Sequence, residues 1–177
     1  DSLLKLEISQ GNKTREFESK YAKYHNMKYG IAVNSGSSAN LVAFSSLIEL
    51  NYLKKGDEII VPSTTFATVV SPLYQLGLKP VYVDIEKDNW NIDADKIDQA
   101  ISSKTKLIMV VHQLGFPANM QKINKIAKRK KLLVLEDCCE AHGAKYQNQI
   151  VGSLSDISTF SFFVAHNITT GEGGMIL

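Results

Sequence analysis

The chain has 177 residues, 44% of them hydrophobic, and a formal net charge of +2, which suits one globular domain with a hydrophobic core. Its only dense basic run, residues 128–131, is explained as a solvated helix C-terminus, so nucleic-acid binding is not indicated. No apolar run approaches the ~20 residues of a membrane span, and two adjacent cysteines make a poor disulfide framework, so a cytoplasmic protein is expected.

Short apolar, β-rich runs alternate with segments of helical period. Strands are predicted at 29–33, 58–61, 80–85, 107–112, 132–136, 157–163 and 174–177, and helices at 13–25, 38–51, 65–76, 93–102 and 120–130. Asp93 is predicted to cap a helix, Gly77 to end one, and Gln147-Asn148 to form a surface turn. Because runs such as residues 107–111 are apolar on both faces, the predicted class is α/β, a three-layer fold with a mostly parallel mixed sheet.

Two segments at strand ends have the character of ligand-binding loops. Residues 34–40, Asn-Ser-Gly-Ser-Ser-Ala-Asn, follow a strand and open a helix, and small residues at a helix N-terminus favour an anion. A plain turn with a serine cap is the alternative. Residues 62–68 also end a strand, where α/β sheets bind their ligands, although the segment by itself favours a core phenylalanine at Phe66.

Two further segments carry titratable side chains. Asp137 and Glu140 follow the buried run 132–136, where a carboxylate is costly unless it has a partner. His166 lies in the segment 161–174, and its ordinary pKa of ~6.5 suits proton abstraction near neutrality. A lone histidine is nevertheless often structural, and this is the interpretation for His25 and His142.

Taken together, three segments resemble the DegT/DnrJ/EryC1/StrS family, which are pyridoxal-phosphate enzymes acting mostly on nucleotide-linked sugars. They are the stretch 161–174, the strand end Glu136-Asp137 and the loop Ser35-Gly36, and the likeness runs from Phe17 onward. The resemblance implies the large domain of a fold-type I enzyme and a homodimer with shared active sites. Because family members are longer, residues 1–177 are expected to be an incomplete cofactor-binding domain that lacks the C-terminal small domain.

The resemblance also assigns a position to His166. Ordinary members have a lysine there, which holds the cofactor as a Schiff base, whereas imidazole forms no stable imine. The histidine-bearing members are sugar 3-dehydratases, in which the histidine is a base. Glu140 falls where transaminases have glutamine and these dehydratases have an acid, although a surface acid is the alternative. His112 resembles the histidine of the family's Val-His-x-x-Gly segment and is either a wall of the site or structural.

The remaining cofactor contacts follow from the same resemblance. Ser37, Ser38 and Ser161 fall on the positions that hold the cofactor phosphate, and serine replaces the usual threonine without loss of the hydroxyl. Phe66 falls on the aromatic that stacks on the pyridine ring. Asp137 falls on the aspartate that keeps the pyridine nitrogen protonated and makes the ring an electron sink.

The cysteine pair Cys138-Cys139 has three interpretations. The first is a pair of small buried hydrophobic residues. A zinc site is not favoured, because the chain has no further cysteine. The third comes from the resemblance: dehydratases acting on CDP-linked 4-keto sugars carry a 2Fe-2S cluster, with one ligand at the position of Cys139. The other ligands would lie beyond Leu177, and dehydratases acting on GDP-linked sugar have no cluster.

We therefore predict a non-covalent pyridoxal 5'-phosphate or pyridoxamine 5'-phosphate enzyme. It would dehydrate a nucleotide-linked 4-keto-deoxysugar at C3, with His166 as the base and Asp137 paired with the ring, and serve deoxysugar synthesis for surface polysaccharide. One alternative is an aminotransferase of the same family, which would need another lysine; the nearest, Lys145, falls at no recognised cofactor position. A second is a non-catalytic cofactor- or sugar-binding homologue.

Overall fold

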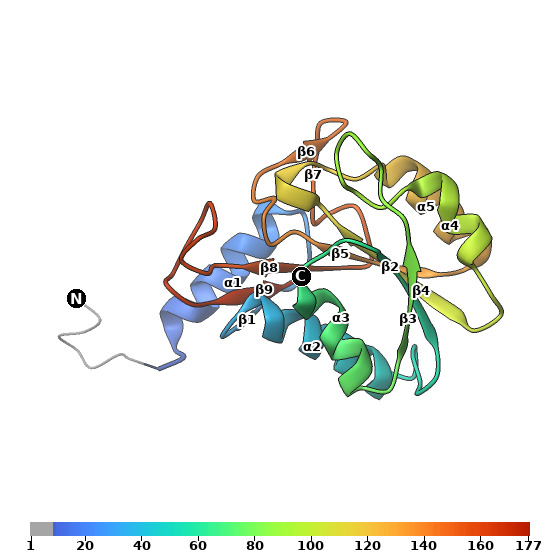
Figure 1. The fold of residues 1–177 in the computed structure, drawn as a ribbon. Coiled ribbons are helices and arrows are strands. Elements are labelled where there is room, and N and C mark those ends of the chain that lie inside the picture. Colours follow the sequence, from blue (N-terminus) through green and yellow to red (C-terminus); the bar gives the residue numbers. More distant parts are fainter. Residues whose placement is uncertain (1–8) are drawn as a thin grey trace.

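The computed structural model describes residues 9–177 and shows a seven-stranded sheet between helical layers (Figure 1). The sheet strands are β1 (Ile31–Val33), β2 (Glu58–Pro62), β3 (Lys79–Val83), β4 (Thr105–Val111), β5 (Leu133–Asp137), β8 (Ile157–Ser161) and β9 (Gly174–Ile176). The helices are α1 (Asn12–Tyr24), α2 (Gly36–Glu49), α3 (Ala67–Gln75), α4 (Ala94–Ala100) and α5 (Met120–Lys130). Every predicted helix and strand is confirmed, with boundaries shifted by at most two residues.

The strand order is β1-β9-β8-β5-β4-β2-β3. Strands β3, β2, β4, β5 and β8 run parallel, whereas β9 is antiparallel to both of its neighbours, β8 and β1. The sheet is therefore mixed and mostly parallel, as predicted. Its parallel strands end at one edge, where ligands of α/β folds bind.

Two hydrophobic clusters explain the layers. Strand side chains alternate between faces, so Ile59 and Val61 of β2 pack with α2 and α3, while Ile60 packs with α4 and α5. A third cluster joins α1 to β8 and β9 through Tyr21, Phe160 and Met175. The core thus lies on both faces of the sheet and confirms the three-layer prediction.

Local sequence signals account for most element ends. The Asp93 carboxylate accepts a hydrogen bond from the Asp95 N–H at 3.0 Å and caps α4, while Gly77 follows α3 with a φ of +73°. The predicted Gln147-Asn148 turn joins a hairpin that the sequence did not predict, β6 (Lys145–Tyr146) and β7 (Gln149–Ile150). The short 3-10 helix η1 (Gln113–Gly115) was also not predicted.

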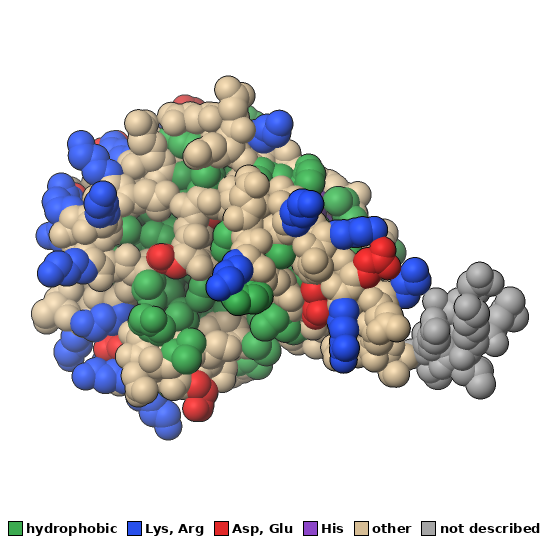
Figure 2. Space-filling view, turned by 180° about the vertical axis from the view of Figure 1, so that it is seen from behind, with side chains coloured by type: hydrophobic (Ala, Val, Ile, Leu, Met, Phe, Trp, Pro, Cys, Tyr) green, Lys and Arg blue, Asp and Glu red, His purple; other side chains and the backbone are tan. Residues whose placement is uncertain are grey.

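The surface carries its basic side chains unevenly. Seen from behind, Lys and Arg side chains are most frequent along the left edge, and hydrophobic side chains gather beside them (Figure 2). Within residues 9–177, no helix combines the length and the apolar character that crossing a bilayer requires.

Candidate functional site

A cavity of about 670 Å³ opens at the carboxyl ends of the parallel strands. Residues that follow β2, β4 and β5 meet there with the last residue of β8, the first turn of α2 and the loop before β9. The lining includes most of the predicted site residues: Ser37, Phe66, His112, Asp137, Cys139, Glu140, Ser161 and His166.

The N-terminus of α2 forms one wall of this cavity. Ser37 and Ser161 both line it, and Gly36 is needed there because an added Cβ would lie 2.5 Å from the Ser161 Cβ. Ser35 caps the helix by accepting the Ser38 N–H at 3.1 Å, and its hydroxyl donates to the Ser38 Oγ at 3.2 Å. The serine-cap interpretation is thus correct for Ser35, and Ser38 belongs to this cap rather than to the lining.

Asp137 ends β5 with its carboxylate held in one orientation. One oxygen accepts the Cys139 N–H at 3.0 Å, and the other accepts the Asn40 side-chain amide at 2.9 Å. Asn40 is oriented in turn by the Thr159 hydroxyl, which donates to its Oδ1 at 2.7 Å. Asp137 is only 5% exposed and lines the cavity, and its carboxylate oxygens can accept hydrogen bonds beyond these two.

The other lining side chains have fewer hydrogen bonds to the protein than Asp137 has. Phe66 is 73% exposed and lines the cavity, so a core phenylalanine is excluded. Glu140 is also exposed, and its carboxylate accepts the Leu114 N–H of η1 at 2.8 Å. Burial, followed by the nearby Asp137 carboxylate, raises the pKa of the Cys139 thiol well above its usual range, so the group is a thiol rather than a thiolate.

His166 sits in the loop between β8 and β9, with its backbone N–H bonded to the Phe163 carbonyl at 3.0 Å. Its Nδ1 is buried and has no hydrogen-bond partner. Two other buried side-chain atoms among residues 9–177 share this property, Thr65 Oγ1 and His25 Nε2. Of these three residues, Thr65 and His166 line the cavity. This is the pattern expected where a ligand completes the hydrogen bonds.

Lysine is missing from the lining. Among the described residues, those that line the cavity include no lysine, and Lys145 lies apart from them in β6. A carbonyl cofactor placed in this cavity would consequently find no amine from these residues to hold it covalently.

The two histidines that do not line the cavity, His25 and His142, serve the packing, as predicted. His142 accepts the Tyr21 hydroxyl at 2.8 Å and donates to the Ser161 carbonyl at 2.8 Å, which ties α1 to the end of β8. His25 is 1% exposed and packs against Tyr21 and Phe160. Burial lowers the pKa of both rings.

Sequence reasoning did not identify Asn40 or Thr65 as site residues. Asn40 lies one helical turn after Gly36, and this spacing from the candidate anion-binding loop was the available signal. Thr65 belongs to the strand-end segment 62–68, but nothing in the sequence distinguishes it from its neighbouring threonines. Cys138 is fully buried in the cluster around Phe160, which confirms the small-hydrophobe interpretation for this cysteine.

Comparison with known proteins gave a consistent result. The model of the DegT/DnrJ/EryC1/StrS aminotransferase family matches residues 2–177. The chain is 41% identical to dTDP-4-dehydro-2,6-dideoxy-D-glucose 3-dehydratase of Saccharopolyspora spinosa, over 100% of this chain and 39% of that protein. It is also 41% identical to GDP-perosamine synthase of Escherichia coli O157:H7, over 96% of this chain and 45% of that protein.

A solved structure shows the same architecture. The E. coli GDP-4-keto-6-deoxy-D-mannose-3-dehydratase with bound hydrated PLP superposes with a TM-score of 0.94 at 40% identity, covering 99% of this chain and 46% of that one. The chain thus spans less than half the length of the relatives it matches.

Proposed function

Because this chain belongs to the DegT/DnrJ/EryC1/StrS aminotransferase family, we propose that it forms the cofactor-binding large domain of a PLP- or PMP-dependent sugar 3-dehydratase. The substrate would be a nucleotide-linked 4-keto-deoxysugar, the class that the names of its relatives describe. One observation supports this choice above others: His166 occupies the cavity with an unpartnered Nδ1, and no described lysine lines it.

The residues present fit such a cofactor. Ser37, Ser161 and the N-terminus of the 14-residue helix α2 would hold its phosphate, since amides and hydroxyls there donate to an anion. The Asp137 carboxylate would hold the protonated ring nitrogen, and the exposed Phe66 ring offers a stacking surface. When bound, the pyridine ring supplies an electron sink for cleavage of bonds next to the attached carbon.

The chain's own residues then perform two tasks. His166 takes up a proton at a ring nitrogen, and its buried Nδ1 is not occupied by any protein group. Asp137, whose carboxylate is oriented by Asn40 and by the Cys139 N–H, would keep the cofactor's pyridine nitrogen protonated.

An aminotransferase is the competing function, because the family description and the likeness to GDP-perosamine synthase are compatible with it. It would require a lysine in reach of the cofactor. A non-catalytic homologue would bind the cofactor or a sugar nucleotide without turnover.

The deciding experiment is the absorbance spectrum of the complete protein with added pyridoxal phosphate, before and after borohydride treatment and dialysis. Under this proposal the cofactor is lost on dialysis and never becomes covalently fixed. An adduct on a lysine would support the aminotransferase, and absence of binding would contradict both enzyme proposals.

We also propose a homodimer with active sites shared between subunits, on the strength of family membership. Light scattering of the complete protein tests the subunit number. Mixing inactive variants with substitutions on different walls tests the sharing, since complementation requires composite sites.

A further inference from the structure

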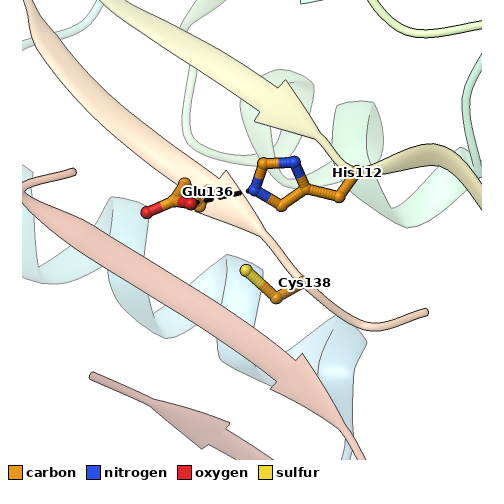
Figure 3. Close-up of side chains that lie close together, drawn as sticks. All are labelled: His112, Glu136 and Cys138. Carbon is orange, nitrogen blue, oxygen red and sulfur yellow. Dashed lines mark hydrogen bonds and ion pairs between the residues drawn. The ribbon is translucent and has the colours of Figure 1, made fainter. Parts of the chain in front are cut away.

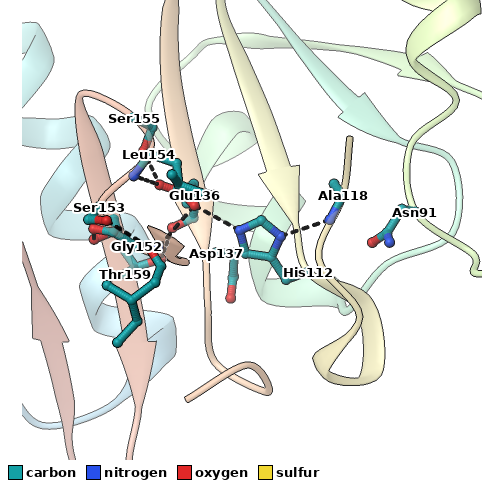
Figure 4. Close-up of polar contacts among 12 residues, drawn as sticks. Asn91, His112, Ala118, Glu136, Asp137, Gly152, Ser153, Leu154, Ser155 and Thr159 are labelled. Atoms are coloured by element: carbon teal, nitrogen blue, oxygen red, sulfur yellow. Dashed lines mark hydrogen bonds and ion pairs between the residues drawn. The ribbon is translucent and has the colours of Figure 1, made fainter. Parts of the chain in front are cut away.

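At the cavity wall, the side chain of His112, which lines the cavity, and that of Glu136, which does not, form a buried polar cluster (Figures 3 and 4). Both are fully buried, and His112 Nε2 lies 2.9 Å from a Glu136 carboxylate oxygen. Glu136 precedes Asp137 on β5, so the two carboxylates point to opposite sides of the same strand. The cluster is therefore adjacent to the site but does not face the position of the ring nitrogen.

The Glu136 carboxylate has all of its hydrogen bonds within the protein. One oxygen accepts His112 Nε2–H and the Gly152 N–H at 2.9 Å each, and the other accepts the Leu154 N–H at 2.9 Å and the Ser155 hydroxyl at 2.7 Å. Although burial acts to raise the pKa of Glu136, these donors hold it below its ordinary value. The group is thus a buried anion with four donors.

His112 connects this anion to two other parts of the wall. Its Nδ1 accepts the Ala118 N–H at 3.1 Å, so in the neutral ring the proton sits on Nε2 and points to Glu136. Its backbone N–H donates to the Asp137 carbonyl at 3.1 Å. His112 therefore fastens the segment 112–118 to the end of β5 at two points, and its bond to Ala118 holds the segment itself together.

A metal site is the other reading of this cluster, because potential ligand atoms of His112, Glu136 and Cys138 lie within 4.8 Å of one another. The imidazole nitrogens and both carboxylate oxygens are already engaged in hydrogen bonds. Burial raises the pKa of the Cys138 thiol well above its usual range, so no thiolate is offered. A metal ion would have to displace this network.

We propose that His112 and Glu136 are positioning residues, which act through Asp137 by holding the end of β5 and the wall segment 112–118 in register at the cofactor cavity. The inference rests on the proposed function, since it requires a cofactor paired with Asp137. Through the His112 backbone bond, a loss of the side-chain pairing would displace the Asp137 carbonyl and, with it, the carboxylate.

Two substitutions of His112 separate its contacts. His112→Gln places an N–H near the Nε2 position and keeps a donor for Glu136, whereas His112→Asn places an oxygen near the Nδ1 position and keeps only the acceptor for Ala118. His25→Ala is the matched control, because His25 is equally buried but does not line the cavity.

In the complete protein, His112→Asn is expected to weaken pyridoxal-phosphate binding about tenfold, which corresponds to ~1.4 kcal/mol, and to shift the absorbance maximum of the bound cofactor. His112→Gln is expected to stay within about threefold of the wild type and to keep its spectrum. In cofactor-free protein, the residue-112 amide should exchange its hydrogen faster in the Asn variant than in the Gln variant. His25→Ala should lower Tm without changing cofactor affinity.

Unchanged affinity and spectrum in His112→Asn, at a lowered Tm, would overturn the positioning role and leave a structural one. Equal losses in the Gln and Asn variants would also overturn it, because the link through Glu136 would then not matter. These failures are seen with a wild type that binds cofactor, whereas a wild type that binds none would overturn the proposed function as well.

Discussion

Glu136, which lies beside the cavity, and His166, which lines it, differ in how their polar atoms are satisfied. Glu136 is a buried charge with four hydrogen-bond donors, supplied by the loop 152–155 and by His112 (Figure 4). His166 is only partly buried, yet its Nδ1 has no protein partner. Glu136, whose oxygens are all satisfied by the protein, has the pattern of a structural residue, and we call it the closed group. His166, whose Nδ1 has no protein partner, has the pattern of a ligand-binding residue, and we call it the open group.

Asp137 is intermediate between Glu136 and His166 in how far the protein satisfies its polar atoms. Two protein donors fix its carboxylate, and its cavity face is left for a further partner. A carboxylate in this position is both held and available, which is what pairing with a charged ring nitrogen requires. The comparison predicts that substitutions at the open group affect chemistry, those at the closed group affect folding, and those at Asp137 affect both unequally.

The largest effect is expected at the open group. His166→Asn removes the only proposed base, so turnover of a nucleotide-linked 4-keto-deoxysugar should fall by up to about 10⁴-fold. Cofactor binding and the unfolding free energy should change little, because Nδ1 makes no protein hydrogen bond. A product assay and the cofactor absorbance of the same sample measure both, and retained turnover would remove His166 from its role.

A second substitution at this position tests where the side chain points. His166→Lys places an amine in the cavity, and it should bond covalently to added pyridoxal phosphate and be fixed by borohydride. Peptide mapping of the reduced protein identifies the modified residue. If no adduct forms at residue 166, the loop between β8 and β9 does not bring this position to the cofactor.

Asp137→Asn should separate catalysis from folding. The amide cannot hold a protonated ring nitrogen as an anion does, so turnover should fall about 10³-fold. The unfolding free energy should fall by only about 1 kcal/mol, because the shape and most hydrogen bonds persist. Equal losses, measured by steady-state kinetics and urea unfolding, would favour a structural role for Asp137.

At the closed group, the effect should appear in stability. Glu136→Gln turns one acceptor into a donor that faces other donors, and should cost about 2–3 kcal/mol of unfolding free energy. Since the folded pKa of Glu136 is below its ordinary value of 4.5, its contribution is complete above pH 4.5 and is lost as pH falls through the folded pKa.

Urea unfolding at neutral pH and at several values below 4.5 tests this direction. The wild type should lose stability on acidification more steeply than Glu136→Gln, because the variant lacks the titrating group. Parallel curves for the two proteins would contradict the assignment of a stabilising anion to Glu136.

The same contrast explains what the sequence could predict. Hydrophobic runs and end signals such as Asp93 and Gly77 act over a few residues, so the five α-helices and seven sheet strands found within residues 9–177 were predictable. The hairpin β6–β7 was not, since two-residue strands leave no periodic signal, although its turn at Gln147-Asn148 was predicted and both residues have positive φ.

Site residues were predictable where a motif carries them and not where a distant contact defines them. Most motif positions meet in one cavity, whereas Ser38 does not line it and is bonded to Ser35, which caps α2. The function of Glu136 depends on donors 16 to 19 residues later and on His112, 24 residues earlier. Such partners become visible only when the strands are assembled.

The smallest effect is expected from a substitution of Lys145, and finding no effect would itself be informative. Lys145 lies in β6 and does not line the cavity, so Lys145→Ala should change the unfolding free energy by less than about 0.5 kcal/mol and leave cofactor binding unaltered. The aminotransferase function needs a lysine at the cofactor, and this is the nearest one along the chain after the Asp137 loop. If Lys145→Ala abolished a borohydride-fixed adduct that the wild type forms, the open group would not be His166 alone, and amino transfer would replace dehydration as the proposed reaction.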